Sequence, residues 1–227
     1  MRVLVVTAVA AEAATAVADT DAAQDVPLPG GYVLTRTPAY DILVGGVGPA
    51  AAAAATATAL AVADAPYGLV VSAGIGGGFP PHAPVGSLVV SDSVVAADLG
   101  AETPDGYLPV DALGFGRTVH PSPAGLSALV AKTVGAVHAP VLTVSTVTGS
   151  AARAAELAAR HPRAAAEAME GFGVAEAAAA HGVPVVEIRA VSNAVGPRDR
   201  AAWRIGDALA ALRRAFHQLV PVLQEQP

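Results

Sequence analysis

Four polar residues stand out because each closely follows, or ends, an apolar segment. Glu12 follows the run RVLVVTA, Glu170 follows AEAM, and Ser192 and Asn193 end the run VVEIRAVSN. A carboxylate can take a proton from a water molecule, and it can accept two parallel hydrogen bonds from neighbouring hydroxyls. A carboxamide offers an N–H and a C=O side by side but cannot act as an acid. Together these residues could orient a water molecule, hold a diol and bind a polar heterocycle.

Each of these residues also has a purely structural interpretation. Glu12 could lie on the surface of a helix, and Glu170 could stabilise a helix start, where a negative charge is favoured. Trp203 is the sole tryptophan, and it could pack in the core or form the wall of a site. The residue types alone leave these alternatives open.

The elements that must position these residues alternate between β-branched runs and Ala-rich segments, which predicts an α/β fold. The expected strands are 2–8, 32–36, 40–46, 68–78, 85–99, 139–147 and 183–193. The expected helices are 10–18, 49–65, 122–136, 149–161, 169–182 and 200–223. Trp203 would lie on the first turn of the last helix, and the Gly- and Pro-rich residues 100–119 would form a loop. We predict one domain over 1–227, with a mostly parallel, mixed central sheet flanked by helices in three layers.

Ligands of such sheets bind where the strands end, at their carboxyl edge. That rule selects the loops 8–12, 45–49, 73–79, 146–150, 168–171 and 192–199. Two of these loops contain the glycine turns GGVGPA and AGIGGG. Neither turn is followed by Lys-Ser or Lys-Thr, so a P-loop is excluded. The turns predict a close approach of the backbone to a neighbour or to a flat ligand, with a phosphate cradle as the alternative.

The composition excludes several classes of function. The net charge is −6, and the chain has a single lysine and no basic block, which argues against nucleic-acid binding by a charged face. The absence of cysteine excludes disulfides and thiolate metal sites. The six histidines are scattered, without an H-x-H or H-x-x-x-H pair, so no metal or other cofactor is expected. There is no G-x-S-x-G motif, which argues against an esterase-type serine.

The N-terminal apolar run could be read as a signal peptide. Glu12 lies inside that run, where a charge is costly, so a first β-strand leading into a helix is the preferred interpretation. No window of about 20 residues is apolar enough to span a bilayer. We therefore expect a cytoplasmic protein with no membrane partner.

Taken together, these segments resemble the nucleoside phosphorylase superfamily, in its nucleosidase branch. The resemblance is to the 5′-methylthioadenosine/S-adenosylhomocysteine nucleosidases, and it runs nearly end to end. MRVLVVTAVAAE resembles their opening strand, LVVSAGIGGG their glycine turn beside the purine, and VGSLVVSDSVVAADL their G-D-x-V-V-x-D strand. AEAMEGFGVAEAA resembles their M-E helix start, and EIRAVSNAVG their R-x-x-S-D segment.

The resemblance implies a role for each matching residue. Glu12 would activate the attacking water, Met169 would lie under the ribose, and Glu170 would bind the ribose hydroxyls. Ser192 and Asn193 would face the purine, with Asn193 taking part in catalysis. The remaining substrate contacts would come from Val47, Ile75, Gly76, Gly77, Val147, Thr148 and Trp203, the last of which would cover the 5′ side. Ala168 stands where the adenosine enzymes carry an additional purine-binding Glu.

One departure changes the implied substrate. The adenosine-type nucleosidases carry Asp where this chain has Asn193, and that Asp protonates N7 of the leaving adenine. An amide N–H can instead bond O6 or N7 of a 6-oxopurine, which an ionised Asp would repel. Asn193 followed by V-G-P-R-D-R-x-x-W resembles the futalosine hydrolases. Their reaction releases hypoxanthine and dehypoxanthine futalosine in an alternative route to menaquinone.

Glu12, and a glycine turn without Arg, favour water over phosphate as the nucleophile. The alternatives are a purine nucleosidase or phosphorylase acting on inosine or methylthioadenosine, and a non-catalytic nucleoside-binding module. A Rossmann-type oxidoreductase is disfavoured because the glycine fingerprint is incomplete. The expected partner is a small nucleoside. Relatives pair through helices near the site, which implies a homodimer or a higher homo-oligomer. Arg198, Arg200 and Arg204 are candidates for binding the carboxyphenyl end of futalosine.

Overall fold

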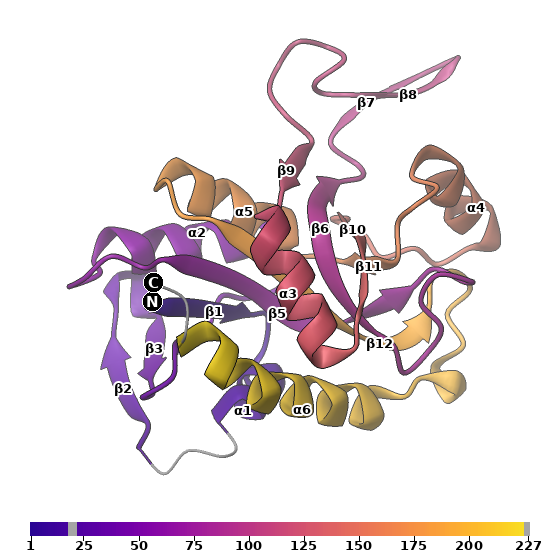
Figure 1. Cartoon of the computed structure of the whole chain (residues 1–227). Coiled ribbons are helices and arrows are strands. Elements are labelled where there is room, and N and C mark those ends of the chain that lie inside the picture. The colour runs from indigo at the N-terminus through magenta and orange to yellow at the C-terminus, as the bar shows by residue number, and fades with distance from the viewer. Residues whose placement is uncertain (18–21, 225–227) are drawn as a thin grey trace.

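The computed structural model describes residues 1–17 and 22–224 and shows a mixed β-sheet covered by helices (Figure 1). The main sheet contains β1 Val3–Thr7, β2 Gln24–Pro27, β3 Val33–Arg36, β4 Asp41–Val44, β5 Leu69–Gly78, β6 Leu88–Ala96, β9 Val119–Pro121, β10 Val137–Thr143, β11 Ala166–Ala168 and β12 Val185–Ala194. A separate hairpin contains β7 Gly100–Thr103 and β8 Gly106–Pro109. The helices are α1 Ala10–Val17, α2 Pro49–Ala61, α3 Ala124–Val134, α4 Ala151–Arg160, α5 Gly171–Ala180 and α6 Ile205–Gln224, with short 3-10 helices η1 Pro29–Gly31 and η2 Arg200–Ala202.

The strand order is β11-β10-β6-β12-β5-β1-β4-β3-β2, with β9 paired to β6. β1 runs parallel to β4 and β5, and β12 runs parallel to β5. β11 pairs with β10 and also, in the antiparallel sense, with β5, so one end of the sheet curls into a closed ring of strands. Glycines make this closure possible, because a Cβ on Gly76 would lie 2.8 Å from the backbone oxygen of Glu167. The predicted close approach of the backbone at AGIGGG is therefore confirmed.

Helices cover both faces of the sheet, as alternate residues of β1 show. Val3 and Val5 pack into a core with α1, α3 and α6, whereas Leu4 and Val6 pack into a second core with α2 and α5. This arrangement confirms the predicted α/β fold with a mixed central sheet between helical layers. In the part of the chain that the structure describes, no helix has both the length and the apolarity needed to cross a membrane.

Several predicted elements need correction. The short strands β2 and β11 were not predicted, and β11 matters because it carries a wall of the site. Residues 100–119 are not a plain loop, since they contain the hairpin β7–β8 and the first residue of β9. Trp203 does not lie on the last helix but in the connection between η2 and α6. Residue 18, the predicted end of the first helix, lies outside the described residues.

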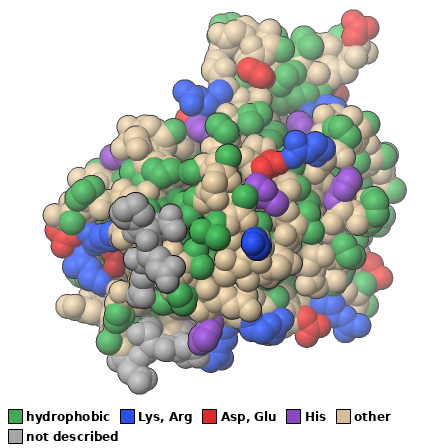
Figure 2. All heavy atoms as spheres, in the orientation of Figure 1, with side chains coloured by type: hydrophobic (Ala, Val, Ile, Leu, Met, Phe, Trp, Pro, Cys, Tyr) green, Lys and Arg blue, Asp and Glu red, His purple; other side chains and the backbone are tan. Residues whose placement is uncertain are grey.

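Residues 99–119, which we call the arm, project from the body of the molecule beyond β6 and β9 (Figure 1). Figure 2 shows hydrophobic side chains on this projection. The exposed large apolar side chains of the arm are Leu99, Leu108, Leu113, Phe115 and Val119. Phe115 is 80% exposed, the largest exposed fraction among these side chains.

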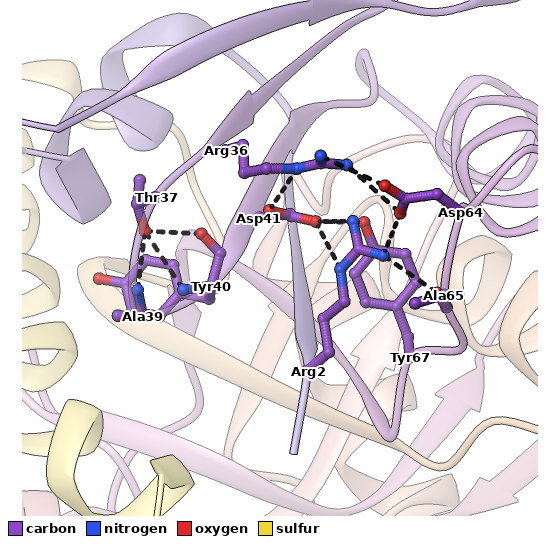
Figure 3. Close-up of polar contacts among 9 residues, drawn as sticks. All are labelled: Arg2, Arg36, Thr37, Ala39, Tyr40, Asp41, Asp64, Ala65 and Tyr67. Atoms are coloured by element: carbon purple, nitrogen blue, oxygen red, sulfur yellow. Dashed lines mark hydrogen bonds and ion pairs between the residues drawn. The ribbon is translucent and has the colours of Figure 1, made fainter.

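A cluster of charged side chains ties together the amino ends of β1 and β4 (Figure 3). Arg2 donates to Asp41 Oδ2 from Nε at 3.0 Å and from Nη2 at 2.6 Å, and the Tyr67 hydroxyl donates to the same oxygen at 2.6 Å. Asp64 forms ion pairs with both Arg2 and Arg36. Burial, followed by the bond to Asp41, raises the pKa of Tyr67. The charges of this cluster are mutually paired, and it lies at the opposite end of the strands from the edge where ligands bind.

Candidate active site

A cavity of about 340 Å³ lies at the carboxyl ends of β1, β5 and β12, beside the start of α5. Its volume falls in the range of small-molecule sites, about 300–1,000 Å³. The sequence-predicted residues that line it are Glu12, Val47, Ile75, Gly76, Gly77, Val147, Thr148, Met169, Glu170, Ser192, Asn193 and Trp203. The other lining residues are Ala8, Val9, Glu167, Ala168, Val195, Gly196, Pro197 and Arg198. The fold thus brings the residues implied by the resemblance to one cavity, and their chemical roles stay predictions.

Glu12 lies in the first turn of α1 and is buried, so its interpretation as a helix-surface residue is wrong. Its Oε2 accepts hydrogen bonds from the backbone N–H of Ala8 at 3.0 Å and of Val9 at 3.3 Å. Its Oε1 accepts from the N–H of Ile75 at 2.9 Å. These bonds fix the carboxylate between the ends of β1 and β5. A carboxylate has further lone pairs, so Glu12 can still accept a hydrogen bond from a water molecule.

Glu170 occupies the N-cap position of α5, but its side chain makes no capping hydrogen bond. The capping interpretation is therefore wrong. Its Oε1 instead accepts from the N–H of Gly48 at 3.2 Å, and its Oε2 lies 3.2 Å from Nη2 of Arg189. Because it is held from the α2 side and from β12, the carboxylate is fixed at the cavity wall, where it can meet a diol.

Arg189 is the buried cation beneath the site. Its side chain is 1% exposed, and its Nε donates to Glu187 Oε1 at 2.8 Å. Burial alone would lower the pKa of Arg189, but Glu187, Glu170 and Glu12 outweigh burial and raise it. Burial raises the pKa of Glu187, and Arg189 opposes that rise. A Cβ at Gly74 would lie 2.5 Å from Glu12 Oε1 and 2.6 Å from Arg189 Nη1, so the glycine leaves room for both groups.

Asn193 lies at a bulge of β12, where the pairing with β5 skips Ser192. The Ser192 hydroxyl lies 2.9 Å from Asn193 Oδ1 and donates to it, which fixes the orientation of the amide. Asn193 Nδ2 donates one hydrogen to the backbone oxygen of Ala194 at 3.0 Å. An amide nitrogen carries two hydrogens, so one N–H remains for a ligand in the cavity. Asn193 can therefore donate to a base atom but cannot protonate it.

Glu167, on β11, is a third buried carboxylate of the cavity wall and is 5% exposed. Its Oε1 accepts from the backbone N–H of Thr148 at 2.9 Å, and its Oε2 accepts from the Thr148 hydroxyl at 2.5 Å. Burial raises the pKa of Glu167, and the two bonds from Thr148 oppose the rise. A fixed acceptor therefore lies on the β11 side of the cavity.

Arg198 and Trp203 form the mouth of the cavity. The guanidinium carbon of Arg198 lies 5.4 Å from the centroid of the Trp203 ring, a cation–π arrangement. Within the described residues, Arg198 is the one Lys or Arg that lines the cavity. Arg200 and Arg204 do not line it. The same part of the chain contains no group of three or more His, Asp or Glu side chains placed to hold a metal ion.

Comparison with known proteins identifies the family. Residues 2–222 match the model of the phosphorylase superfamily. The chain is 63% identical to futalosine hydrolase of Streptomyces coelicolor over 99% of its own length and 97% of that protein. The chain belongs to the futalosine hydrolases. A futalosine hydrolase of Acidothermus cellulolyticus is 49% identical over 95% of this chain and 89% of its own.

Among solved structures, the chain is similar to the 5′-methylthioadenosine/S-adenosylhomocysteine nucleosidase of Colwellia psychrerythraea in complex with adenine. The TM-score is 0.80 at 25% identity, over 96% of each chain. The predicted resemblance to both groups of nucleosidases is therefore confirmed.

The sequence predicted no role for Glu167, Glu187 or Arg189. A signal existed for the last two, because opposite charges two residues apart on an otherwise apolar strand point to the same face. For Glu167 the signal was a charge within the apolar stretch AAAEAM, one position before the site where the adenosine enzymes carry their extra Glu. Of the three candidate arginines, Arg198 lines the cavity and Arg200 and Arg204 do not, and the role of Arg198 stays a prediction.

Proposed function

We propose that the chain hydrolyses the N-glycosidic bond of futalosine and releases hypoxanthine and dehypoxanthine futalosine. The observation that carries the proposal is the Asn193 amide, which is oriented by Ser192 and has an N–H left for a base atom. Such a donor suits O6 and N7 of a 6-oxopurine. The 63% identity to a curated futalosine hydrolase supports the same substrate.

The bond breaks through a sugar with oxocarbenium character, so positive charge grows on the ribose as negative charge grows on the base. Glu12 accepts a proton from a water molecule while the water oxygen attacks C1′. Glu170 binds O2′ and O3′, and its charge stabilises the growing cation. Arg189 does not touch the substrate in this scheme; it positions Glu170 through their 3.2 Å ion pair.

The electrons of the C1′–N9 bond leave with the base. The N–H of Asn193 stabilises the departing hypoxanthine anion at O6 or N7, and the anion then takes a proton from solvent. Hypoxanthine is a better leaving group than adenine, so a hydrogen bond can replace an acid here. Water rather than phosphate is the nucleophile, because a phosphate would meet the buried carboxylates of Glu12 and Glu170.

Futalosine has a carboxyphenyl group beyond its 5′ carbon, and the mouth of the cavity suits that group. The Trp203 ring offers an apolar face, and Arg198 offers a cation that forms no ion pair with a described residue. An Arg198→Gln variant should therefore lose activity on futalosine, while its low activity on inosine, which lacks the carboxylate, should stay unchanged. Equal losses on both would remove Arg198 from this role.

The experiment that tests the function is base release in phosphate-free buffer, followed by chromatography. Futalosine, aminodeoxyfutalosine, inosine and methylthioadenosine are compared side by side. We expect fast release of hypoxanthine from futalosine and little release from the other three. Comparable release of adenine from methylthioadenosine would contradict the proposed base selection, and the absence of any release would support a binding module.

We further propose that the enzyme acts in the cytoplasm, in the futalosine route to menaquinone, as a homodimer or higher homo-oligomer. The exposed apolar side chains of the arm support self-association. Light scattering on the purified chain should give at least twice the monomer mass of 22.3 kDa. A Phe115→Ser variant should shift the equilibrium toward the monomer, and a wild-type chain that is monomeric at micromolar concentration would contradict the assembly.

A further inference from the structure

We infer that Glu167 accepts a hydrogen bond from N1–H of the 6-oxopurine and, with Asn193, determines which base the site accepts. The inference rests on the proposed function, because it assigns a specificity residue for the base of that reaction. The resemblance implied no role for this carboxylate. The adenosine enzymes carry their extra Glu one position later, where this chain has Ala168.

The first argument is the position of Glu167 in the sheet. Gly77 of β5 pairs with Asn193 of β12 on one side and with Glu167 of β11 on the other. Neighbouring strands lie about 4.8 Å apart, so the Cα atoms of Glu167 and Asn193 are separated by about 10 Å across the glycine. Paired residues of neighbouring strands point to the same face, and both side chains line the cavity. Gly77 lies between them and lines the same cavity.

The second argument is the geometry of the slot. A Cβ built on Gly77 would lie 3.4 Å from Asn193 Nδ2 and 2.9 Å from Val195 Cγ2. The face of Gly77 toward which a Cβ would point is thus the face on which the amide and Val195 lie, and all three residues line the cavity. A purine lying on this face would present its O6/N7 edge to Asn193 and the adjacent N1 position toward the opposite wall, where Glu167 lies.

The third argument is the chemical state of Glu167. The carboxylate is buried, yet no Lys, Arg or His of the described chain forms an ion pair with it. Its two hydrogen bonds both come from Thr148, so each oxygen keeps a lone pair free. A buried carboxylate without a cation is costly unless further donors reach it. The N1–H of hypoxanthine is such a donor, whereas N1 of adenine is an acceptor and would be repelled.

The bonds from Thr148 also explain how the acceptor is aimed. The N–H and hydroxyl of Thr148 bind different oxygens of Glu167, which holds the plane of the carboxylate in place. Asn193 is oriented in the same way by Ser192. Two fixed groups on opposite walls therefore read two neighbouring positions of the base, and a base that mismatches one of them leaves a buried polar group unpaired.

A structural role is the alternative to be separated by experiment. Glu167 could simply anchor the Thr148 loop to β11, without touching the base. In that case its replacement would disturb hydrolysis of every nucleoside by the same factor. If Glu167 determines specificity, its replacement instead changes the ratio of the kcat/KM values of two substrates that differ only in the base.

The test is a Glu167→Gln variant assayed on futalosine and on its 6-amino analogue, aminodeoxyfutalosine, which has the same 5′ end. The Gln amide places an N–H where the N1–H of hypoxanthine needs an acceptor, so we expect kcat/KM for futalosine to fall roughly 10- to 100-fold. The same N–H can donate to N1 of adenine. The 6-amino substrate should keep or gain activity. Glu156→Gln, an exposed change on α4, is the matched control and should leave both values unchanged.

A binding measurement separates failure of this inference from failure of the proposed function. Calorimetry with free hypoxanthine and free adenine needs no turnover, so it is informative whichever nucleoside the chain hydrolyses. Glu167→Gln should weaken hypoxanthine binding by about tenfold or more and spare adenine. Equal weakening of both bases, or an unchanged substrate ratio in a folded variant, would overturn the role of Glu167. Lack of futalosine hydrolysis by the wild type would overturn the function instead.

Discussion

The replacement of Arg189 by Met should separate the structural and catalytic parts of the buried charge network. Arg189 neutralises Glu187, which is 0% exposed, and pairs with Glu170 at 3.2 Å. Removal of one partner of a buried ion pair leaves an uncompensated charge and costs about 3–5 kcal/mol. For a chain of this size, the melting temperature should fall by about 6–20 °C. Urea denaturation and a thermal scan measure both quantities.

The second variant, Glu187→Met/Arg189→Met, identifies the cause of the loss. It removes both the Glu187 carboxylate and the Arg189 guanidinium, so no unpaired buried charge remains and much of the lost free energy of unfolding should return. Hydrolysis should stay low in both variants, because Glu170 has lost the cation that positions it. A single variant that loses less than about 1 kcal/mol, or a double variant less stable than the single one, would refute the assignment of the cost to an unpaired Glu187.

Three further perturbations test other parts of the site. Gly74→Ala would place a Cβ 2.5 Å from Glu12 Oε1. Misplacement of one catalytic hydrogen bond costs about 1.4 kcal/mol, so kcat should fall at least tenfold. Gly125→Ala, whose Cβ would meet no atom within 4 Å, is the control, and equal kinetics for the two variants would contradict the crowding of Glu12. Asn193→Asp should lower kcat/KM for futalosine roughly 10- to 100-fold at pH 7, because the ionised side chain repels O6; an unchanged value in steady-state assays would exclude that repulsion. Burial raises the pKa of Glu167 in the folded chain, so the folded state binds more protons than the unfolded state. The free energy of unfolding should therefore fall as pH rises from about 4.3, the pKa of an unperturbed Glu, through the raised pKa of the folded state. Glu167→Gln should flatten this fall in urea titrations at several pH values, and an unchanged dependence of the unfolding free energy on pH would disprove the linkage.

The sequence predicted the elements that a short local pattern determines, such as a strand formed by one apolar run. The β-branched run RVLVVTA gave β1, and the apolar run before Asn193 gave β12. The carboxyl ends of these strands meet in one layer, which is why Glu12 and Asn193 could be assigned to one cavity before their contacts were known. The resemblance to nucleosidases supplied the remaining site residues.

The features that the sequence did not predict depend on contacts between distant segments. β11 has three residues, too few for a recognisable period, and it forms because it pairs with both β10 and β5. The partners of Glu170 are Gly48 and Arg189, from two other elements, so a helix-capping role was as reasonable from sequence as a ligand role. Trp203 was placed on α6 because helix patterns do not reveal the 3-10 turn that precedes it.

The most direct test of the proposed chemistry is the fate of the oxygen that attacks C1′. Futalosine is incubated with the purified chain in ¹⁸O-labelled water containing phosphate, and the sugar product is analysed by mass spectrometry. Hydrolysis predicts free hypoxanthine and a dehypoxanthine futalosine that carries one ¹⁸O at C1′. A sugar 1-phosphate, or intact futalosine after prolonged incubation, would contradict the assignment of the chain as a water-dependent nucleosidase.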